Sequence, residues 1–395
     1  MFWSRRDFLF SLISAGGLTA CQSGNIQFAN SLNSSNLGRV SSNKYLIIIE
    51  LAGGNDGLNT VIPYTDAYYY QLRPQISLSR ERIIKIDQWL GLNEALTGAA
   101  QLYKRGEVAI IQNLGYPSPS FSHFRSTALW HVGGDGTTAP KQGWIASAAQ
   151  KYRPKAAAHG ISFSDEMGYF HDKYGVFLSA KNVEQIKSLK IRKIPASRSK
   201  KVLVSDISKR LNTLNNSVAI LKENLEGFQG KVEFSNGLLS KQLQQVVEVI
   251  QSGASVPIFA VKLSSFDTHE SQIWRHRSLL KELDRAIMQT RRALVGSGHW
   301  DDTIILTTSE FGRTPIENKS RGTDHGSAAP HFLFGGGING GIYGKNPRLN
   351  MLLSNRNIQY MIDYRAVYDL LIRKFFRVNS DFIKYKADIL ENICI

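Results

Sequence analysis

The sequence predicts an α/β fold, with a largely parallel sheet covered by helices on both faces. Short apolar runs rich in β-branched residues recur along the 395-residue chain, and each has the length of a buried strand. Longer amphipathic stretches lie between several of these runs. Alternation of this kind is typical of a parallel sheet that helices cover on both sides. The length allows one large domain or two smaller ones.

Six segments are predicted to be the buried strands. Each is a continuous apolar run rather than a strict alternation, as expected where both faces of a sheet are covered. In chain order the segments are Tyr45–Leu51, Val108–Gln112, Ile161–Phe163, Pro257–Leu263, Thr303–Thr307 and Phe332–Phe334.

Two regions carry the clearest helical patterns. Within Glu270–Val295, apolar residues recur at intervals of three, four and seven, which gives one apolar face. The segment Ser205–Ile250 is predicted to form two helices, broken near Gly227–Asn236. We expect residues 44–395 to be a single domain, with these two helices as an insertion at about residues 200–252.

The first twenty residues have the order of an export signal. The basic pair in Ser4–Leu9 (SRRDFL) matches the twin-arginine signature, and the apolar run Phe8–Leu18 is too short to span a bilayer. Leu18–Cys21 (LTAC) fits the cleavage site of a bacterial lipoprotein, which would leave Cys21 lipidated ahead of a polar tether over residues 21–43. We expect the twin-arginine machinery to export the protein to the periplasm or cell envelope, where Cys21 anchors it to a membrane.

Charge and cysteine content narrow the possible functions. The formal net charge of +16 favours anionic surroundings, such as lipid headgroups, acidic polysaccharide or phosphorylated substrate. Nucleic acid is disfavoured because no recognised binding motif is present. The chain also lacks GxGxxG and GxxxxGK[ST] loops, which disfavours dinucleotide and P-loop chemistry. With only Cys21 and Cys394, we expect a core, or a core plus metal, rather than a disulfide to hold the fold.

Four predicted strands are followed by residues that can bind a metal or react. Ligands of an open α/β sheet bind beyond the carboxyl ends of its strands, so these residues should meet at one edge. They are Asn55 and Asp56; Ser120, Ser122 and His123; Asp267 and His269; and Glu310, Arg313, Asp324 and His325. Carboxylate oxygens and neutral imidazoles bind zinc, manganese, calcium or magnesium according to their ratio and geometry. A serine at a helix N-terminus lies where N–H groups favour an anion.

Each of these segments also has a purely structural interpretation. The Asn-Asp-Gly sequence is most often a turn, and the Asp-Thr-His sequence can cap a helix. His123 could be a general base or a local hydrogen-bonding group, and Arg313 could clamp a phosphate or tie a loop to a carbonyl. His331, directly before an apolar run, is typical of a core histidine. A gathering of all four segments at one edge favours a site.

Five motifs carry a resemblance to a known family. They are GGNDGLNTVIPY, SHFRS, FDTH, SEFGRT and GTDHG, and they cover nearly all of the chain that follows the export signal. In this order they resemble the bacterial exported family known as the domain of unknown function 1501. That family is similar in fold to the alkaline phosphatase and sulfatase superfamily.

The resemblance implies roles for individual residues. Asp56 would be the early acid that binds one metal, and Ser122 the nucleophile. The other implied metal ligands are Asp267, His269, Glu310 and His325. Phe311 departs from the pattern, since the superfamily usually offers a ligand there, and Asp324 or Asn55 would have to compensate. The sulfatase motif Cys/Ser-x-Pro-x-Arg is not reproduced around Ser122.

The expected function is a metal-dependent hydrolase of an anionic ester, a phosphoester rather than a sulfate ester. It would use one or two divalent ions (zinc, manganese, calcium or magnesium), with Ser122, His123 and Arg313 as the catalytic residues. The alternative is a non-catalytic envelope lipoprotein with a vestigial site that binds polysaccharide or a partner protein. Phe311 favours this alternative, because loss of a ligand inactivates such sites. Transfer of a phospho-headgroup would use the same site as hydrolysis.

Overall fold

The computed structural model describes residues 43–137, 142–164, 166–172, 175–190, 202–379 and 385–394. The predicted export signal, lipidated Cys21 and most of the tether lie outside these residues. Residues 43–395 make up one compact unit.

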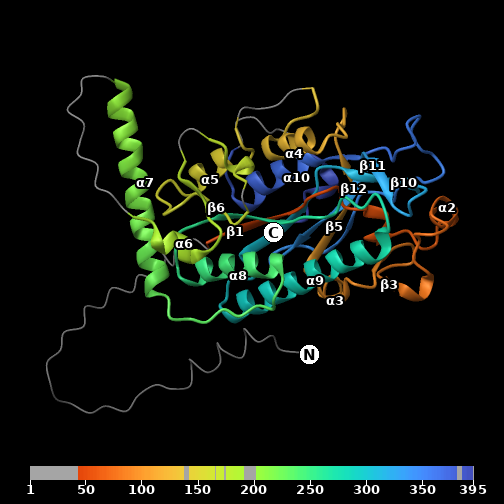
Figure 1. Cartoon of the computed structure of the whole chain (residues 1–395), viewed down its shortest axis with the longest axis horizontal. Coiled ribbons are helices and arrows are strands. Elements are labelled where there is room, and N and C mark those ends of the chain that lie inside the picture. The colour runs from red at the N-terminus through yellow and green to blue at the C-terminus, as the bar shows by residue number, and fades with distance from the viewer. Residues whose placement is uncertain are drawn as a thin grey trace, which may run out of the picture. The chain divides into compact units, whose positions relative to one another are not determined.

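A nine-stranded sheet forms the centre of the described chain (Figure 1). Its strands are β1 (Tyr45–Leu51), β5 (Val108–Gly115), β6 (Gly160–Ser162), β7 (Phe177–Ser179), β8 (Ile258–Leu263), β9 (Thr303–Thr308), β12 (Ala329–Phe334), β13 (Gly341–Tyr343) and β14 (Ile362–Asp363). The order across the sheet is β13-β5-β12-β9-β1-β8-β6-β7, and β14 also pairs with β5. All six predicted strands are therefore present, to within a few residues at their ends.

Most neighbouring strands run in parallel. β1 pairs in parallel with β8 and β9, and β8 continues in parallel through β6 to β7. β12 is antiparallel to both β9 and β5, so β5 again runs in the direction of β9. The prediction of a largely parallel α/β sheet is confirmed. The carboxyl ends of β1, β5, β8 and β9 consequently lie at one edge, where the candidate site residues follow them.

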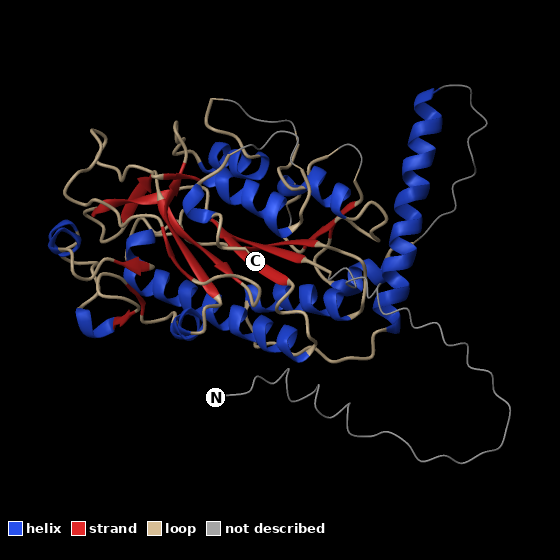
Figure 2. Cartoon of the chain, turned by 180° about the vertical axis from the view of Figure 1, so that it is seen from behind, coloured by secondary structure: helices blue, strands red, loops and turns tan. Residues whose placement is uncertain are grey.

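Helices cover both faces of the sheet (Figure 2). The helices in the described ranges are α2 (Ala67–Leu72), α3 (Thr97–Lys104), α4 (His123–Val132), α5 (Ala146–Tyr152), α6 (Val183–Ser188), α7 (Val202–Gly227), α8 (Leu238–Gln251), α9 (Gln272–Gly296) and α10 (Tyr364–Leu370). Of these, α7 packs on α6 and α2 on β10 rather than on the central sheet. The predicted helix at 270–295 is α9, and the predicted broken pair is α7 and α8. None of the helices in the described ranges is long and apolar enough to cross a membrane.

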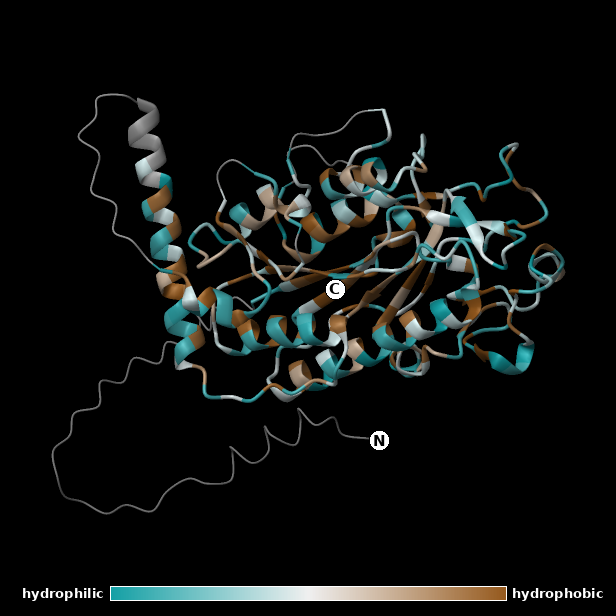
Figure 3. Ribbon diagram, viewed as in Figure 1, coloured by the Kyte–Doolittle hydropathy of each residue, from teal (hydrophilic) through white to brown (hydrophobic). Residues whose placement is uncertain are grey.

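The alternation of side chains along β1 divides the core into two layers. Ile47 and Ile49 pack into one apolar cluster together with residues of α3, α8 and α9. Leu46 and Ile48 pack into another, together with residues of α4, α5 and α10. This period of two follows from strand geometry, because successive side chains point to opposite faces. Figure 3 shows the resulting apolar stripes on the helices and the central strands.

Two small sheets and several short turns complete the described structure. β2 (Val61–Ile62), β4 (Gly91–Asn93) and β3 (Ile83–Lys85) form one sheet, and β10 (Gly312–Glu317) and β11 (Thr323–Gly326) form a hairpin. Helical turns cover Gly57–Asn59, Arg80–Arg82, Gly168–Phe170, Leu371–Phe375 and Asp388–Leu390.

The β10–β11 hairpin differs from the loop that we expected after β9. Asn318 closes its turn, since Oδ1 accepts hydrogen bonds from the N–H groups of Ser320 and Gly322 at 2.9 and 3.0 Å. Local polar and glycine residues suggested a loop, whereas the pairing of Arg313 with His325 in the ladder makes these residues strands.

His331 is a core residue, in line with its structural interpretation. It lies on β12, 2% exposed, with its ring centroid 5.0 Å from that of Trp130. Its Nδ1 is 3.1 Å from the carbonyl oxygen of Thr307, an acceptor, so Nδ1 donates. Burial disfavours the imidazolium and lowers the pKa of His331 to about 4, although the bond to Thr307 acts in the opposite direction.

We predict that His331 makes the protein less stable in acid. Between about pH 6.5 and pH 4 the unfolded chain protonates this histidine and the native protein does not. The free energy of unfolding should therefore fall with falling pH, by up to about 1.4 kcal/mol per pH unit from this residue alone. Urea unfolding of His331→Gln over this pH range should give a shallower slope than the wild type. His171→Gln, at an exposed position, should keep the wild-type slope, and equal slopes for all three proteins would contradict the prediction.

Candidate metal centre

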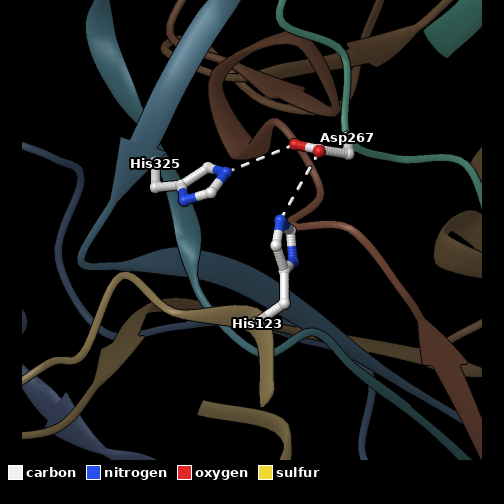
Figure 4. A group of neighbouring side chains, drawn as sticks. All are labelled: His123, Asp267 and His325. Carbon is white, nitrogen blue, oxygen red and sulfur yellow. Dashed lines mark hydrogen bonds and ion pairs between the residues drawn. The ribbon is translucent and has the colours of Figure 1, made fainter. Parts of the chain in front are cut away.

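Three histidines and one aspartate meet at the carboxyl edge of the sheet. Asp267 and His269 follow β8, His325 lies on β11, and His123 is the first residue of α4, which follows β5. Figure 4 shows the side chains of His123 and His325 directed at the carboxylate of Asp267 from two sides. Three segments that are far apart in the sequence therefore build this cluster.

The ε nitrogens of the three imidazoles surround Asp267. Its Oδ1 lies 3.1 Å from Nε2 of His269 and 3.3 Å from Nε2 of His325. Its Oδ2 lies 3.5 Å from Nε2 of His123. Ligand atoms of His123, Asp267 and His325 all lie within 4.8 Å of one another, close enough to share one metal ion.

Hydrogen bonds at the δ nitrogens fix which ring nitrogen carries the proton. Nδ1 lies 2.8 Å from Glu310 Oε1 in His123, 2.8 Å from the carbonyl oxygen of Phe121 in His325, and 3.2 Å from Asp324 Oδ1 in His269. Carbonyl and carboxylate oxygens accept, so each Nδ1 is the donor. In the neutral ring the lone pair is then on Nε2. Metal-binding histidines have this arrangement, in which an acceptor orients each ring from behind.

The positions of His269 and His325 suit a cation between them. Their Nε2 atoms are 3.0 Å apart. With both Nδ1 atoms protonated, two lone pairs face each other at this distance, and a metal ion or an added proton would remove the repulsion. Burial lowers the pKa of His325, and the charge of Arg313 lowers it further, against the effect of its bond to Phe121. The lowered pKa favours the neutral, metal-binding form.

Arg313 binds the carboxylate of Asp267 and is not exposed to a substrate anion, which corrects our expectation. Its side chain is fully buried. The guanidinium donates to Asp267 Oδ1 and to the carbonyl oxygens of Gly53, Gly54, Phe266 and Thr323. Burial alone would raise the pKa of Asp267, but the bond and charge of Arg313 outweigh it, so the pKa is lowered. The carboxylate is therefore ionised, as a metal ligand requires.

Glu310 and Asp324 lie behind the histidines rather than among the converging ligand atoms. Glu310 is buried, and its Oε1 accepts from the N–H of Gly53 at 2.8 Å as well as from His123. Asp324 is exposed and also accepts from Nδ2 of Asn318 at 3.3 Å. Both residues were expected to be metal ligands, and the structure gives them orienting contacts instead.

The expectation that Asp56 binds a metal is also corrected, because its carboxylate is buried and hydrogen-bonded to other side chains. Arg73 NH1 lies 2.7 Å from Oδ2 and NH2 lies 3.0 Å from Oδ1. Gln272 and the N–H of Leu58 donate to the same group. Burial would raise the pKa of Asp56, but the charge and hydrogen bonds of Arg73 overcome this effect and lower it. Asp56 is thus one half of a buried ion pair, outside both groups of potential ligands in the described chain.

Phe311, at the position where the resemblance implied a further ligand, packs against two histidines of the cluster. Its ring centroid lies 4.3 Å from that of His325 and 4.9 Å from that of His123. The ring needs Gly54 beside it, since a Cβ at that position would lie 2.5 Å from Phe311 Cε2. Phe311 therefore packs against two of the three imidazoles that surround Asp267.

Ser122 lies between two residues that contact the centre. It precedes α4 as the N-cap residue, and its side chain makes no capping hydrogen bond. The carbonyl of Phe121 accepts from His325, while His123 contacts Asp267 and Glu310. Ser122 therefore lies between two residues, Phe121 and His123, that both contact the cluster, and its own side chain is exposed.

A second group of potential ligands is neutralised by a lysine. Glu50, His131 and Glu166 offer ligand atoms to a common point. However, Lys262 Nζ lies 2.6 Å from Glu166 Oε1 and 3.5 Å from Glu50 Oε1, and His131 Nε2 lies 2.9 Å from Glu50 Oε2. The ammonium group of Lys262 thus supplies the positive charge that a metal ion would otherwise supply to these carboxylates. Sequence reasoning missed this network, although Glu50 inside an otherwise apolar strand was a signal for it.

We predict that Arg73 is essential for stability. Replacing it with alanine would leave Asp56 as an uncompensated buried charge, which typically costs about 3–5 kcal/mol in the free energy of unfolding. Urea denaturation of Arg73→Ala measures this loss. Arg82→Ala breaks a more exposed ion pair, with Glu94 at 2.5 Å, and should cost less than about 1 kcal/mol. Similar losses in the two variants would contradict the assignment of Asp56 to a structural pair.

Comparison with known proteins places the chain in a family. The model of the family described as "Protein of unknown function (DUF1501)" matches residues 111–369. This range holds all four residues of the cluster, so the resemblance drawn from the motifs is confirmed at the level of the family. No curated protein matches the sequence.

Among solved structures, three examples illustrate the similarity. The phosphonate monoester hydrolase of Agrobacterium radiobacter matches with 10% identity and a TM-score of 0.41, over 88% of this chain and 77% of that chain. The PsFucS1 sulfatase from Pseudoalteromonas sp. matches with 10% identity and a TM-score of 0.40, over 89% and 72%. A protein in the alkaline phosphatase superfamily from Vibrio parahaemolyticus matches with 12% identity and a TM-score of 0.36, over 77% and 64%. Because the family match spans more than half of the sequence, this chain belongs to the DUF1501 family.

Proposed function

We propose that this protein is a metal-dependent hydrolase of an anionic ester, a phosphoester in preference to a sulfate ester. The observation that carries the proposal is the convergence of three imidazole Nε2 atoms on an ionised aspartate. Each imidazole is oriented by an acceptor at Nδ1, and the aspartate is oriented by a buried arginine. The motif resemblance to the alkaline phosphatase and sulfatase superfamily supports the same chemistry.

The donor set favours one ion of the zinc type. His123, His325 and Asp267, whose ligand atoms lie within 4.8 Å of one another, offer nitrogen-rich coordination, which suits zinc or another transition metal better than calcium or magnesium. A bound metal would supply charge that polarises the ester oxygens and stabilises negative charge in the transition state. Glu310, Asp324 and the carbonyl of Phe121 would hold the three rings in the required tautomer.

Ser122 is the proposed nucleophile. Its hydroxyl is exposed at the start of α4, a ten-residue helix whose first N–H groups favour an anionic ester. Attack would form a bond from Ser122 Oγ to the central atom of the ester and break the bond to the alcohol, which leaves with a proton. Water would then hydrolyse the seryl ester and restore the hydroxyl.

A non-catalytic binding protein is the second candidate, and Phe311 is the observation that favours it. The ring packs on both His123 and His325, so a metal could serve the fold without turning over a substrate. The two candidates share the metal and differ in the requirement for Ser122. Metal content and ester turnover therefore have to be measured separately.

We predict near-stoichiometric metal in the folded protein. Elemental analysis after incubation with zinc should give about one ion per chain for the wild type. Both Asp267→Asn and His325→Gln should lose most of it, because each removes one of the three residues that can share the ion. A chelator should lower the Tm of the wild type, since a ligand that binds only the native state stabilises it. His171→Gln, far along the chain from these ligands, is the control, and wild type without metal would refute the centre.

We predict that Ser122→Ala abolishes turnover while leaving metal content unchanged. With an aryl phosphate as substrate, kcat/KM should fall at least about a hundredfold, as expected for loss of a covalent nucleophile. Ser120→Ala serves as the matched control, because Ser120 also precedes α4 and is two residues away from Ser122. If Ser122→Ala keeps full activity, the nucleophile assignment is wrong. If metal binds but no ester is turned over, the binding-protein candidate is favoured.

A further inference from the structure

A groove of about 650 Å³ opens along the same edge of the sheet as the candidate metal centre. Residues that follow three neighbouring strands line it: Ser164 after β6, Lys181 and Asn182 after β7, and Ser265 after β8. The first turns of α8 form the opposite wall, with Lys241 and Gln245 among them. A volume of this size is within the usual range for a bound small molecule or a short oligomer.

The groove begins next to the proposed reaction site. Ser265 precedes Asp267 by two residues, so their Cα atoms are at most about 7 Å apart. From there the lining continues outward past β6 to β7, the last strand on that side of the sheet. A ligand chain in the groove could therefore present one of its groups at the metal centre while the rest lies over β6 and β7.

Two lysines give the groove its charge. Its lining contains three lysines and no acidic residue. Lys262 is neutralised by Glu166 and Glu50. Lys181 and Lys241 are exposed, and neither has an ion-pair partner in the described part of the chain. Two separate positive charges are thus available to a ligand.

The amide groups of the lining also favour acceptors on the ligand. Gln245 Oε1 accepts from the N–H of Val183 at 2.7 Å, and Asn182 Oδ1 accepts from the N–H of Gln185 at 2.8 Å. Because their oxygen ends are fixed in this way, the NH2 ends of both side chains are left as donors. The polar side chains of the lining that are not already paired therefore include hydrogen-bond donors and two positive charges.

We propose that this groove binds an anionic oligosaccharide, a sugar chain with repeated sulfate or carboxylate groups. Two lysines on separate elements suit charges spaced along a chain, and the serines and amides suit sugar hydroxyls. A protein partner would need an apolar anchor, and a single-stranded nucleic acid would need aromatic rings for stacking. The aromatic ring in the lining, Phe163, is buried, and the exposed apolar side chain, Leu238, is of a type that is rare among the anchors of protein interfaces. If the sugar chain is also a substrate, that role rests on the proposed hydrolase and on an ester group carried by the sugar. Binding of the sugar chain in the groove rests on neither.

Calorimetric titration of the full chain tests the groove directly. The probes are a sulfated dextran oligosaccharide, an oligogalacturonate of equal length, a neutral dextran oligosaccharide and tripolyphosphate. We expect one or both charged sugars to bind, and the neutral sugar not to bind. The sulfated and carboxylated probes separate the two sources of charge. Tripolyphosphate that binds as tightly as the better charged sugar would overturn the saccharide assignment.

A charge-matched pair of double variants locates the binding site. Lys181→Gln/Lys241→Gln should weaken the binding of the charged sugar about tenfold and make it less dependent on salt. Lys104→Gln/Lys155→Gln removes the same charge from exposed lysines that precede β5 and β6, at the other edge of the sheet, and should bind like the wild type. Equal weakening in the two double variants would overturn the proposal.

A third variant separates this inference from the proposed function. Asp267→Asn should lose metal yet keep its affinity for the charged sugar, because Asp267 is not among the lining residues. A wild type that binds a charged sugar but does not turn over aryl phosphate would confirm the groove and count against the hydrolase. A wild type that cleaves aryl phosphate but binds neither charged sugar would leave the hydrolase standing and refute the groove.

Discussion

The candidate site depends on the buried guanidinium of Arg313. Its five hydrogen bonds reach the turn after β1, the segment after β8 and strand β11. A buried cation is costly unless it is fully hydrogen-bonded and paired. Four carbonyl oxygens and one carboxylate meet that requirement, so the three segments are held in register around one side chain. The aspartate that pairs with it is also the residue on which the histidines converge.

The backbone around Arg313 is adapted to this close approach. Gly53 and Gly54 have φ values of 118° and 79°, a region that L side chains rarely adopt. A Cβ on Gly53 would lie 2.3 Å from the backbone nitrogen of Asp267. The glycines after β1 therefore allow the turn to pack directly on the segment that carries Asp267. Their role is to bring two strand ends together, which a sequence interpretation as a generic turn does not convey.

Sequence patterns were sufficient for the strands and for part of the site. Continuous apolar runs gave the central strands, and the rule that ligands bind at carboxyl ends predicted that Asp267, His269 and His325 would come together. The partner of Asp56 could not be found in this way. Arg73 lies 17 residues further along in a segment without a motif, and only the tertiary fold brings the two side chains into contact. Residue type alone likewise favoured Asp56 as a ligand, since a carboxylate bound by arginine and one bound by metal look the same in sequence.

The sequence likewise could not show which residues converge on Asp267 and which ones orient the converging side chains from behind. Glu310 and His123 both follow strand ends, and either could bind a metal directly. The structure separates them by direction, because Glu310 contacts Nδ1 of His123 while Nε2 of the same ring faces Asp267. Motif spacing places residues at an edge, but the rotation of each side chain depends on packing, here against Phe311.

The candidate metal centre and the neighbouring groove lie at the same edge of the sheet but differ in the residues that the strand ends supply. The loops after β1, β9 and β5 are tied together by Arg313, Glu310 and Phe311, which leaves a closely packed cluster of imidazoles. Beyond β8 the strands β6 and β7 have three residues each, and the lining residues that follow them are serine, lysine and asparagine together with a buried phenylalanine. With Lys262 neutralised by Glu50 and Glu166, the unpaired charge in this part lies on Lys181, which follows β7, and on Lys241 of α8. Arg313, the cation within the cluster, is buried and paired with Asp267, while Lys181 and Lys241 are left within reach of the anionic ligand that we propose for the groove.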